Sequence, residues 1–215
     1  MYSAILIVRH GREEARCRAG EDDGQGPSLN PVGREQARLL ADHLANSPWR
    51  DAVQIYHSPR RRCVQTARVL AQRLRLPCTQ LSALRSLDPD SSSIDAWDFV
   101  ANEIKSIPPL VPHIPAVRGG ETWASFVDRT DRELHAIFER HVAQAVIVVA
   151  HSGTVAAAMH ALAGCPLAQA SRFYAAADNC SLTEWRRIPS PHPQADPNGQ
   201  FVLKRLNVTD HLSHA

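Results

Sequence analysis

The chain has 215 residues, 44% of them hydrophobic, and a formal net charge of +2. This size and composition fit one large globular domain with a substantial core. Acidic and basic residues alternate along most of the chain, so the charge pattern favours neither a nucleic-acid nor a membrane partner. The five cysteines form no Cys-x-x-Cys pair, which argues against a disulfide framework and a zinc site. Together with an N-terminal apolar run too short for a signal peptide, these features predict a cytoplasmic protein.

Three short apolar runs predict β-strands, and each of them is followed by a histidine. In chain order, residues 5–8 lead into Arg9-His10-Gly11, residues 53–56 into His57-Ser58, and residues 146–150 into His151-Ser152-Gly153. Because the first and third runs are β-branched and continuously apolar, they predict central strands covered on both faces. Two further runs, 182–185 and 201–204, predict strands joined by a long hairpin loop.

Four stretches with apolar residues at helical spacing lie between these strands, at 31–46, 60–74, 122–141 and 154–163. Asn30 is the predicted N-cap of the first, and Gly164 and Pro166 end the last. The alternation of strands and helices predicts a three-layer α/β sandwich with a mostly parallel central sheet flanked by helices. The whole chain, 1–215, is interpreted as one domain with an irregular insertion around 86–120, where Asp, Ser and Pro are frequent.

Ligands of open α/β sheets bind at the carboxyl ends of the strands, and three predicted strands end here in basic or imidazole groups. Arginine and histidine side chains that meet there would suit a phosphate dianion, because guanidinium forms bidentate, charge-assisted hydrogen bonds. We expect no metal site, since the histidines lack metal-binding spacing and cations beside them would repel a metal ion. His57 fits either the rim of this pocket or a structural place in the core.

The strand-end motifs occur in a specific combination with three other segments. In chain order the segments are Arg9-His10-Gly11, 29–37 (LNPVGREQA), 58–67 (SPRRRCVQTA), 119–122 (GGET), 150–153 (AHSG) and 207–212 (NVTDHL). This set resembles the histidine phosphatase superfamily, also called the phosphoglycerate mutase-like or Arg-His-Gly family. The resemblance covers nearly the whole chain, and the second segment stands where the family usually has Leu-Thr-x-x-Gly-x-x-Gln-Ala.

The resemblance implies a phosphatase that needs neither metal nor cofactor and forms a phosphohistidine on His10. Arg9 and Arg62 would neutralise the phosphoryl group in transfer, and His151 would add a hydrogen bond as charge develops. Arg62 is selected from three consecutive arginines because the family's arginine lies three residues after the proline of the Ser-Pro motif. The expected substrate-binding residues are Gly11, Ser58, Glu121, Ser152 and Gly153, the last two at a helix start.

Two details of this expected site remain open at the level of the sequence. Either Nδ1 or Nε2 of His10 can attack, although a hydrogen bond to a neighbouring carbonyl would fix the tautomer. Arg60 and Arg61 are interpreted as solvated or substrate-rim residues.

One departure from the family concerns the acid that protonates the leaving group. Many members carry a glutamate in a Leu-Arg-Glu-like segment, whereas this chain has Ser86 at that position. Asp88 is the first candidate for a substitute, because in an extended segment it faces the same side as Ser86. Asp90 and Glu121 follow, and Asp88 as a merely solvated loop residue stays an alternative. A substrate with a good leaving group, or a domain that mainly binds phosphorylated ligands, would also fit Ser86.

A second departure follows Arg-His-Gly, where mutases and sugar phosphatases of the family often carry Glu-Thr and then an Asn. This chain has Arg12-Glu13-Glu14-Ala15-Arg16, in which Arg12 or Arg16 either recognises an anionic part of the substrate or is simply exposed. The leading hypothesis is a phosphomonoesterase acting on a small phosphorylated metabolite, or else on a phosphoprotein. Phosphoglycerate mutase is the enzyme alternative, disfavoured by the short insertion and the missing glutamate. A catalytically weakened phosphate-binding or regulatory domain is the non-enzyme alternative.

Overall fold

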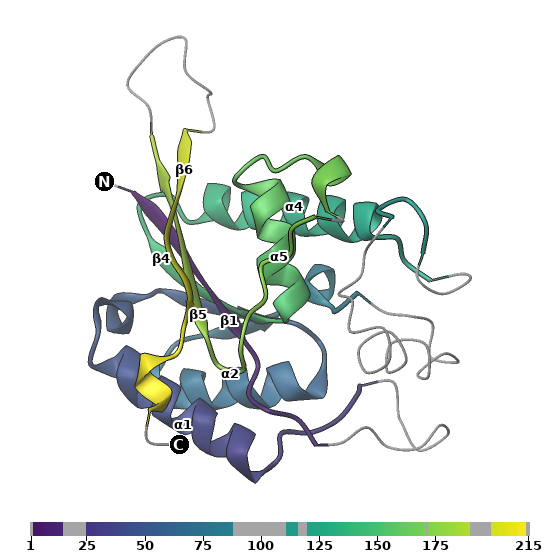
Figure 1. Ribbon diagram of the computed structural model, residues 1–215. Coiled ribbons are helices and arrows are strands. Elements are labelled where there is room, and N and C mark those ends of the chain that lie inside the picture. Colours follow the sequence, from purple (N-terminus) through teal and green to yellow (C-terminus); the bar gives the residue numbers. More distant parts are fainter. Residues whose placement is uncertain are drawn as a thin grey trace.

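The computed structural model describes residues 2–14, 25–87, 111–115, 120–170, 172–189 and 199–213. Its strands are β1 (Ser3–Arg9), β2 (Gln54–His57), β3 (Cys78–Gln80), β4 (Ala145–Ala150), β5 (Leu182–Ile188) and β6 (Gln200–Val208). Its α-helices in these ranges are α1 (Pro31–Ala45), α2 (Arg61–Leu74), α4 (Trp123–Arg140) and α5 (Ser152–Ala161). The strands form one sheet in the order β3-β2-β4-β1-β5-β6. Helices α1 and α2 cover one face and α4 and α5 the other (Figure 1), which confirms the three-layer α/β sandwich.

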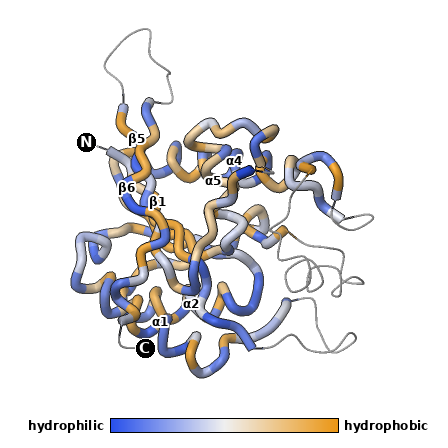
Figure 2. The backbone as a smooth tube through the Cα atoms, in the orientation of Figure 1, coloured by the Kyte–Doolittle hydropathy of each residue, from blue (hydrophilic) through white to orange (hydrophobic). Residues whose placement is uncertain are grey.

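The strands β1 and β4 form the centre of the sheet and are buried on both faces, as their continuous apolar sequences predict. Along β1, Leu6 and Val8 pack into the core beneath α1 and α2. Ile5 and Ile7 alternate with them and pack into the core beneath α4 and α5. Figure 2 shows these central strands as the hydrophobic middle of the molecule.

The helices begin and end close to their predicted bounds. Asn30 caps α1, because its side chain accepts a hydrogen bond from the Gly33 amide at 2.8 Å. Thr122 caps α4 in the same way through the Ser125 amide. Helix α5 starts two residues before its predicted first residue, at Ser152, directly after the histidine that ends β4. No helix in the described part of the chain is long and apolar enough to cross a membrane.

Two features of the sheet differ from the sequence prediction. Strand β3 was not predicted, because its three residues are all exposed and carry no apolar pattern. Strand β6 is longer than the predicted 201–204, while its antiparallel pairing with β5 is the one that a hairpin predicts. The predicted irregular insertion falls largely outside the described residues, at 88–110 and 116–119, and so does most of the predicted hairpin loop, at 190–198.

The parallel part of the sheet decides where a site can form. Strand β4 pairs in parallel with β1 on one side and with β2 on the other. The carboxyl ends of three neighbouring strands therefore meet at one edge, with Arg9 opposite Ala150 and His57 opposite Val149. This is the edge where ligands of open α/β sheets bind.

Candidate active site

The backbone at the three strand ends is fixed by hydrogen bonds to the central strand. The amide of His10 donates to the carbonyl of Ala150 at 3.0 Å, and the amide of Ser58 donates to the carbonyl of Val149 at 3.0 Å. The predicted residues His10, Ser58 and His151 consequently leave the sheet side by side.

The turn after β1 is packed tightly against α1 and α2. The backbones of Gly11 and Gly33 approach so closely that a Cβ at Gly11 would collide with the Gly33 carbonyl. The Gly11 amide donates to Thr66 Oγ1 at 3.1 Å, and the Thr66 hydroxyl donates to the Arg62 carbonyl at 2.8 Å. Thr66 thus links the Arg-His-Gly turn to the helix that carries Arg62.

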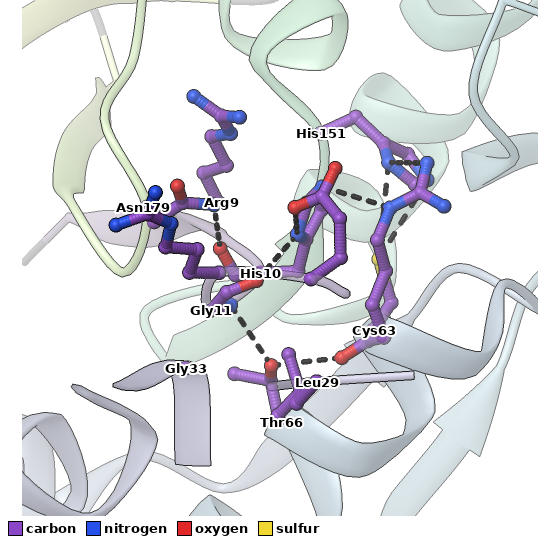
Figure 3. A network of polar contacts seen from close by, with 12 residues as sticks. Arg9, His10, Gly11, Leu29, Gly33, Cys63, Thr66, His151 and Asn179 are labelled. Carbon is purple, nitrogen blue, oxygen red and sulfur yellow. Dashed lines mark hydrogen bonds and ion pairs between the residues drawn. The ribbon is translucent and has the colours of Figure 1, made fainter. Parts of the chain in front are cut away.

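The imidazole of His10 has a defined tautomer. Its Nδ1 lies 2.8 Å from the Gly11 carbonyl, which can only accept a hydrogen bond, so Nδ1 carries the proton. Its Nε2 therefore holds a lone pair, and Nε of Arg62 donates to it at 3.0 Å. Figure 3 shows His10 with its contact to Gly11. The ring is 3% exposed. Burial, and after it the charge of Arg62, lower the pKa of His10 well below its ordinary value, so the ring is neutral at pH 7.

The second histidine of the site, His151, is held by its other ring nitrogen. Its Nε2 lies 2.8 Å from Ser58 Oγ, and its Nδ1 lies 3.5 Å from Nη2 of Arg62. Its ring centroid is 5.3 Å from that of His10. Burial and then the charge of Arg62 also lower the pKa of His151 well below its ordinary value. Arg62 therefore stands between two neutral imidazoles and contacts both.

Arg9 lies beside this group and is anchored to the loop before β5. Its Nη1 donates to the Ala177 carbonyl at 2.6 Å, and its buried Nε has no hydrogen-bond partner among the described residues. The charge of Arg9 contributes to the lowered pKa of both histidines, which places its guanidinium near them. From the same loop, Asn179 Nδ2 donates to the His10 carbonyl at 3.0 Å. Arg9 therefore adds a positive charge beside the two histidines, while its Nε is buried.

The first turn of α5 completes the site, because the first amides of a helix lack partners inside the helix and attract anions. Ser152 and Gly153 occupy this turn. A Cβ at Gly153 would lie 3.3 Å from the ring of Phe126, so the helix start is packed directly on α4. The Ser152 hydroxyl accepts from the Ala177 amide at 3.1 Å and so joins this turn to the loop before β5.

Comparisons with known proteins identify the family of this chain. The sequence profile described as "Histidine phosphatase superfamily (branch 1)" matches residues 5–190. The chain belongs to the histidine phosphatase superfamily. It is similar to phosphoserine phosphatase 1 of Hydrogenobacter thermophilus, with 28% identity over 216 residues that cover 97% of this chain and 93% of that protein. It is also similar to a glucosyl-3-phosphoglycerate phosphatase of Mycolicibacterium vanbaalenii, with 28% identity over 76% of this chain and 75% of the relative.

Among solved structures, the phosphoserine phosphatase of Entamoeba histolytica in complex with 3-phosphoglyceric acid superposes with a TM-score of 0.69. The match has 18% sequence identity and covers 98% of this chain and 99% of that one, so it supports the fold. Family membership makes this chain an enzyme of the phosphatase class.

Glu121, a further predicted site residue of this phosphatase, is bound by arginines. Nε and Nη2 of Arg129 donate to its two carboxylate oxygens at 2.6 and 2.8 Å, and Arg85 donates to it at 3.2 Å. Arg129 also donates to the carbonyls of Ala83 and Ser86. The segment that carries Ser86 is thereby tied to α4. The two other acid candidates, Asp88 and Asp90, lie outside the described residues.

The structure also places the residues that the sequence left open. His57 is buried, and its Nδ1 lies 2.8 Å from the Ser58 carbonyl, which gives it a structural contact within the strand end. Arg12 is exposed and lines a cavity of about 660 Å³ together with Asp178, Asn179 and Asp210. Arg16 falls outside the described residues. Within the described ranges, no three His, Cys, Asp or Glu side chains gather as a metal-binding group.

Three residues near the reacting groups were not singled out from the sequence. Cys63 Sγ lies 3.6 Å from His151 Nε2, and burial raises the pKa of this thiol to about 12, so it stays protonated. Thr66 could have been found, because it lies one helical turn after Arg62. Glu13 Oε2 lies 3.5 Å from Nδ1 of His10. This contact could not be predicted from the spacing of the two residues, because it depends on the turn at Gly11.

Proposed function

We propose that this phosphatase hydrolyses monoesters of small phosphorylated metabolites without a metal ion, through a phosphohistidine at Nε2 of His10. The observation that carries the proposal is the hydrogen bond from Nδ1 to the Gly11 carbonyl. It directs the lone pair of a neutral, buried imidazole toward Arg62, and a neutral imidazole is a competent nucleophile near pH 7.

The cationic groups around His10 would bind the phosphoryl group in line with this lone pair. In the structure, Nε of Arg62 donates to Nε2 of His10. A phosphate dianion is a stronger acceptor than an imidazole, so we expect it to take this donor and free the nucleophile. The positive charge of Arg9 and the first amides of α5 would attract the remaining oxygens. This binding supplies the positioning and charge stabilisation on which phosphoryl transfer depends.

His151 would stabilise the transition state through Nδ1, the ring nitrogen nearer to Arg62. When the hydroxyl of Ser58 donates to Nε2, the proton of the neutral ring lies on Nδ1 and can be donated to a phosphoryl oxygen. The hydroxyl proton of Ser58 is available to Nε2 of His151, because the Arg60 amide donates to a lone pair of the Ser58 oxygen at 3.3 Å and does not use that proton. Ser58 thus acts on the substrate through His151.

The leaving group still needs a proton, and Asp88 is the acid we propose first. Its neighbour Ser86 is tied to α4 through Arg129, which brings the start of this segment to a defined place. Glu121 is the weaker candidate, because three hydrogen bonds from two arginines occupy its carboxylate. After the alcohol leaves, water attacks phosphorus and gives a proton to the carboxylate that the acid has become. The P–N bond then breaks, and its electron pair returns to Nε2.

The class of substrate is inferred from the relatives. Those reported above are named for phosphoserine and glucosyl-3-phosphoglycerate, which are both small phosphomonoesters. Phosphoserine is therefore the first natural substrate to test.

The test is hydrolysis of an activated aryl phosphate and of phosphoserine in the presence of EDTA, with wild type and His10→Ala compared. We expect the wild type to turn over both esters and the variant neither. Loss of wild-type activity in EDTA would contradict metal independence, and activity retained by His10→Ala would contradict the phosphohistidine. Asp88→Asn should slow the alkyl ester far more than the aryl ester, because only the alkyl leaving group needs the proton. Equal slowing of both esters would remove Asp88 from this role.

A further inference from the structure

A carboxylate lies against the proposed nucleophile on the side away from the reacting nitrogen. Glu13 Oε2 is 3.5 Å from Nδ1 of His10, and the Glu13 side chain is about one third exposed. The backbone holds this residue in place, since Glu13 pairs with Leu29 and its carbonyl accepts from Asn30 Nδ2 at 3.2 Å. The neighbouring amide of Glu14 donates to the Ser28 carbonyl at 2.8 Å. The turn after Arg-His-Gly therefore directs Glu13 back onto the ring of His10.

We propose that Glu13 is the counter-charge of the phosphorylated His10 ring, a positioning residue that holds the proton on Nδ1 through both halves of the reaction. This inference rests on the proposed phosphohistidine and assigns a function to a residue that the proposed mechanism does not otherwise use.

The charge balance of the reaction creates the need for such a group. When Nε2 bonds to phosphorus, the ester P–O bond breaks, and its electron pair leaves with the alcohol oxygen, which takes a proton from the acid. The ring keeps its Nδ1 proton and becomes a cation. When water attacks phosphorus, it gives a proton to the carboxylate left by the acid, the P–N electron pair returns to Nε2, and the ring is neutral again. If the Nδ1 proton were lost in between, imidazolate would have to leave, and hydrolysis would be much slower.

The surroundings of His10 oppose a positive ring. The charged and titratable side chains that face it come from β1, the turn after it, α2 and the start of α5, and they are Arg9, Glu13, Arg62, Cys63 and His151. Two of them are cations, and the buried thiol and second imidazole are neutral. Within the described residues, Glu13 provides the one carboxylate in ion-pair contact with His10.

The charge of Glu13 also reaches the neighbouring Cys63. Burial raises the pKa of the Cys63 thiol, and the negative charge of Glu13 adds to this direction. Cys63 itself contacts His151.

The position of Glu13 also separates it from the missing acid. In an in-line transfer, the leaving oxygen lies beyond phosphorus on the side opposite Nε2, whereas Glu13 contacts the ring at Nδ1. The role of counter-charge is thus distinct from the role proposed for Asp88.

The test compares Glu13→Gln and Glu13→Asp with Glu14→Gln, which removes the same charge from the exposed neighbouring residue. Turnover of an aryl phosphate in EDTA is measured across pH, and the phosphoenzyme is followed by rapid quenching. The carboxylate raises the pKa of the Nδ1 proton in the phosphorylated ring, so its removal should move the alkaline limb of kcat to lower pH by about one unit. Formation of the phosphoenzyme should slow about tenfold. Glu13→Asp should restore most of both, and Glu14→Gln should match the wild type.

The outcomes distinguish this inference from the proposed function. If the phosphoenzyme forms on His10 and the Glu13→Gln profile superposes on the wild type, the counter-charge proposal is wrong and the phosphohistidine stands. A Glu13→Gln variant that slows only esters with poor leaving groups, with its alkaline limb unmoved, would make Glu13 the acid and also overturn the proposal. Absence of phosphate on His10 in the wild type would instead overturn the proposed function.

Discussion

The two histidines at the ends of β1 and β4 share burial, a lowered pKa and contact with Arg62, yet they are held by opposite ring nitrogens. In His10, Nδ1 is bound to the carbonyl of Gly11, and in His151, Nε2 is bound to the hydroxyl of Ser58. A carbonyl only accepts, whereas a hydroxyl can donate or accept. The first ring is therefore fixed in one tautomer, which suits a nucleophile, and the second can change its tautomer, which suits a transition-state donor.

The largest expected effects are the losses of turnover when each of the two histidines is replaced. His10→Ala should lower turnover by about 10⁴-fold or more, because the nucleophile itself is lost. His151→Ala should cost about 10²- to 10³-fold, the usual effect of removing one transition-state donor. Single-turnover kinetics with an aryl phosphate measure both, and thermal melting reports whether each variant folds. Equal losses in two folded variants would contradict the division of roles.

Arg62 contacts both rings, so its replacement should weaken the contribution of each histidine to phosphoryl transfer. Arg62→Ala should lower kcat/KM by about 10²- to 10³-fold, and Arg62→Lys should recover only part of it, because an ammonium cannot reproduce the planar guanidinium. Arg68→Ala on the same helix is the matched control, since Arg68 is exposed. Comparable losses in Arg62→Ala and Arg68→Ala would show that general helix charge, and no specific contact, is responsible.

Ser58→Ala tests the hydroxyl that distinguishes His151 from His10. The substitution leaves a buried ring nitrogen without its partner, so we expect kcat/KM to fall about tenfold and the free energy of unfolding to fall by about 1–2 kcal/mol. Phosphoenzyme formation measured after rapid mixing should slow, while the phosphate stays on His10. A Ser58→Ala enzyme with wild-type kinetics would show that Ser58 does not set the tautomer of His151.

The smallest expected effect is a shift in the acid limb of the pH profile of kcat/KM. Because burial and Arg62 lower the pKa of His10, its Nε2 should stay unprotonated as the pH falls through 6.5. Arg62→Gln removes the positive charge beside the ring, so the pKa of His10 should rise toward its ordinary value and the acid limb should move to higher pH. Titration of the His10 imidazole by NMR measures this pKa directly, because no substrate is present whose own ionisation would change the profile. A His10 that titrates near 6.5 in the wild type would contradict the lowered pKa.

The sequence predicts most of the fold because the relevant signal is local. The β-branched run before Arg9 and the apolar run before His151 lie in the two most buried strands, where continuous apolar character is the pattern required. Strand β3 cannot be predicted in this way, because its three residues are exposed and carry no apolar pattern. They form a strand because they pair with β2 at the edge of the sheet.

The composition of the site is predictable and its hydrogen bonding is not. The motifs select His10, Arg62 and His151, and the structure brings these three into mutual contact. Which ring nitrogen of His10 carries the proton depends on the path of the backbone at Gly11, and that path depends on the close packing against Gly33 more than 20 residues later. The contact of Glu13 with His10 arises from the same turn.

The most direct test of the phosphohistidine is to trap the phosphoenzyme and locate its phosphate. Wild-type enzyme in EDTA is mixed with an excess of phosphoserine or aryl phosphate and quenched in alkali, and the position of the phosphate is determined by mass spectrometry and ³¹P NMR. We predict an acid-labile, alkali-stable phosphate on Nε2 of His10. Phosphate on Nδ1, phosphate on another side chain, or turnover without any phosphoenzyme on His10 in single-turnover experiments would contradict it.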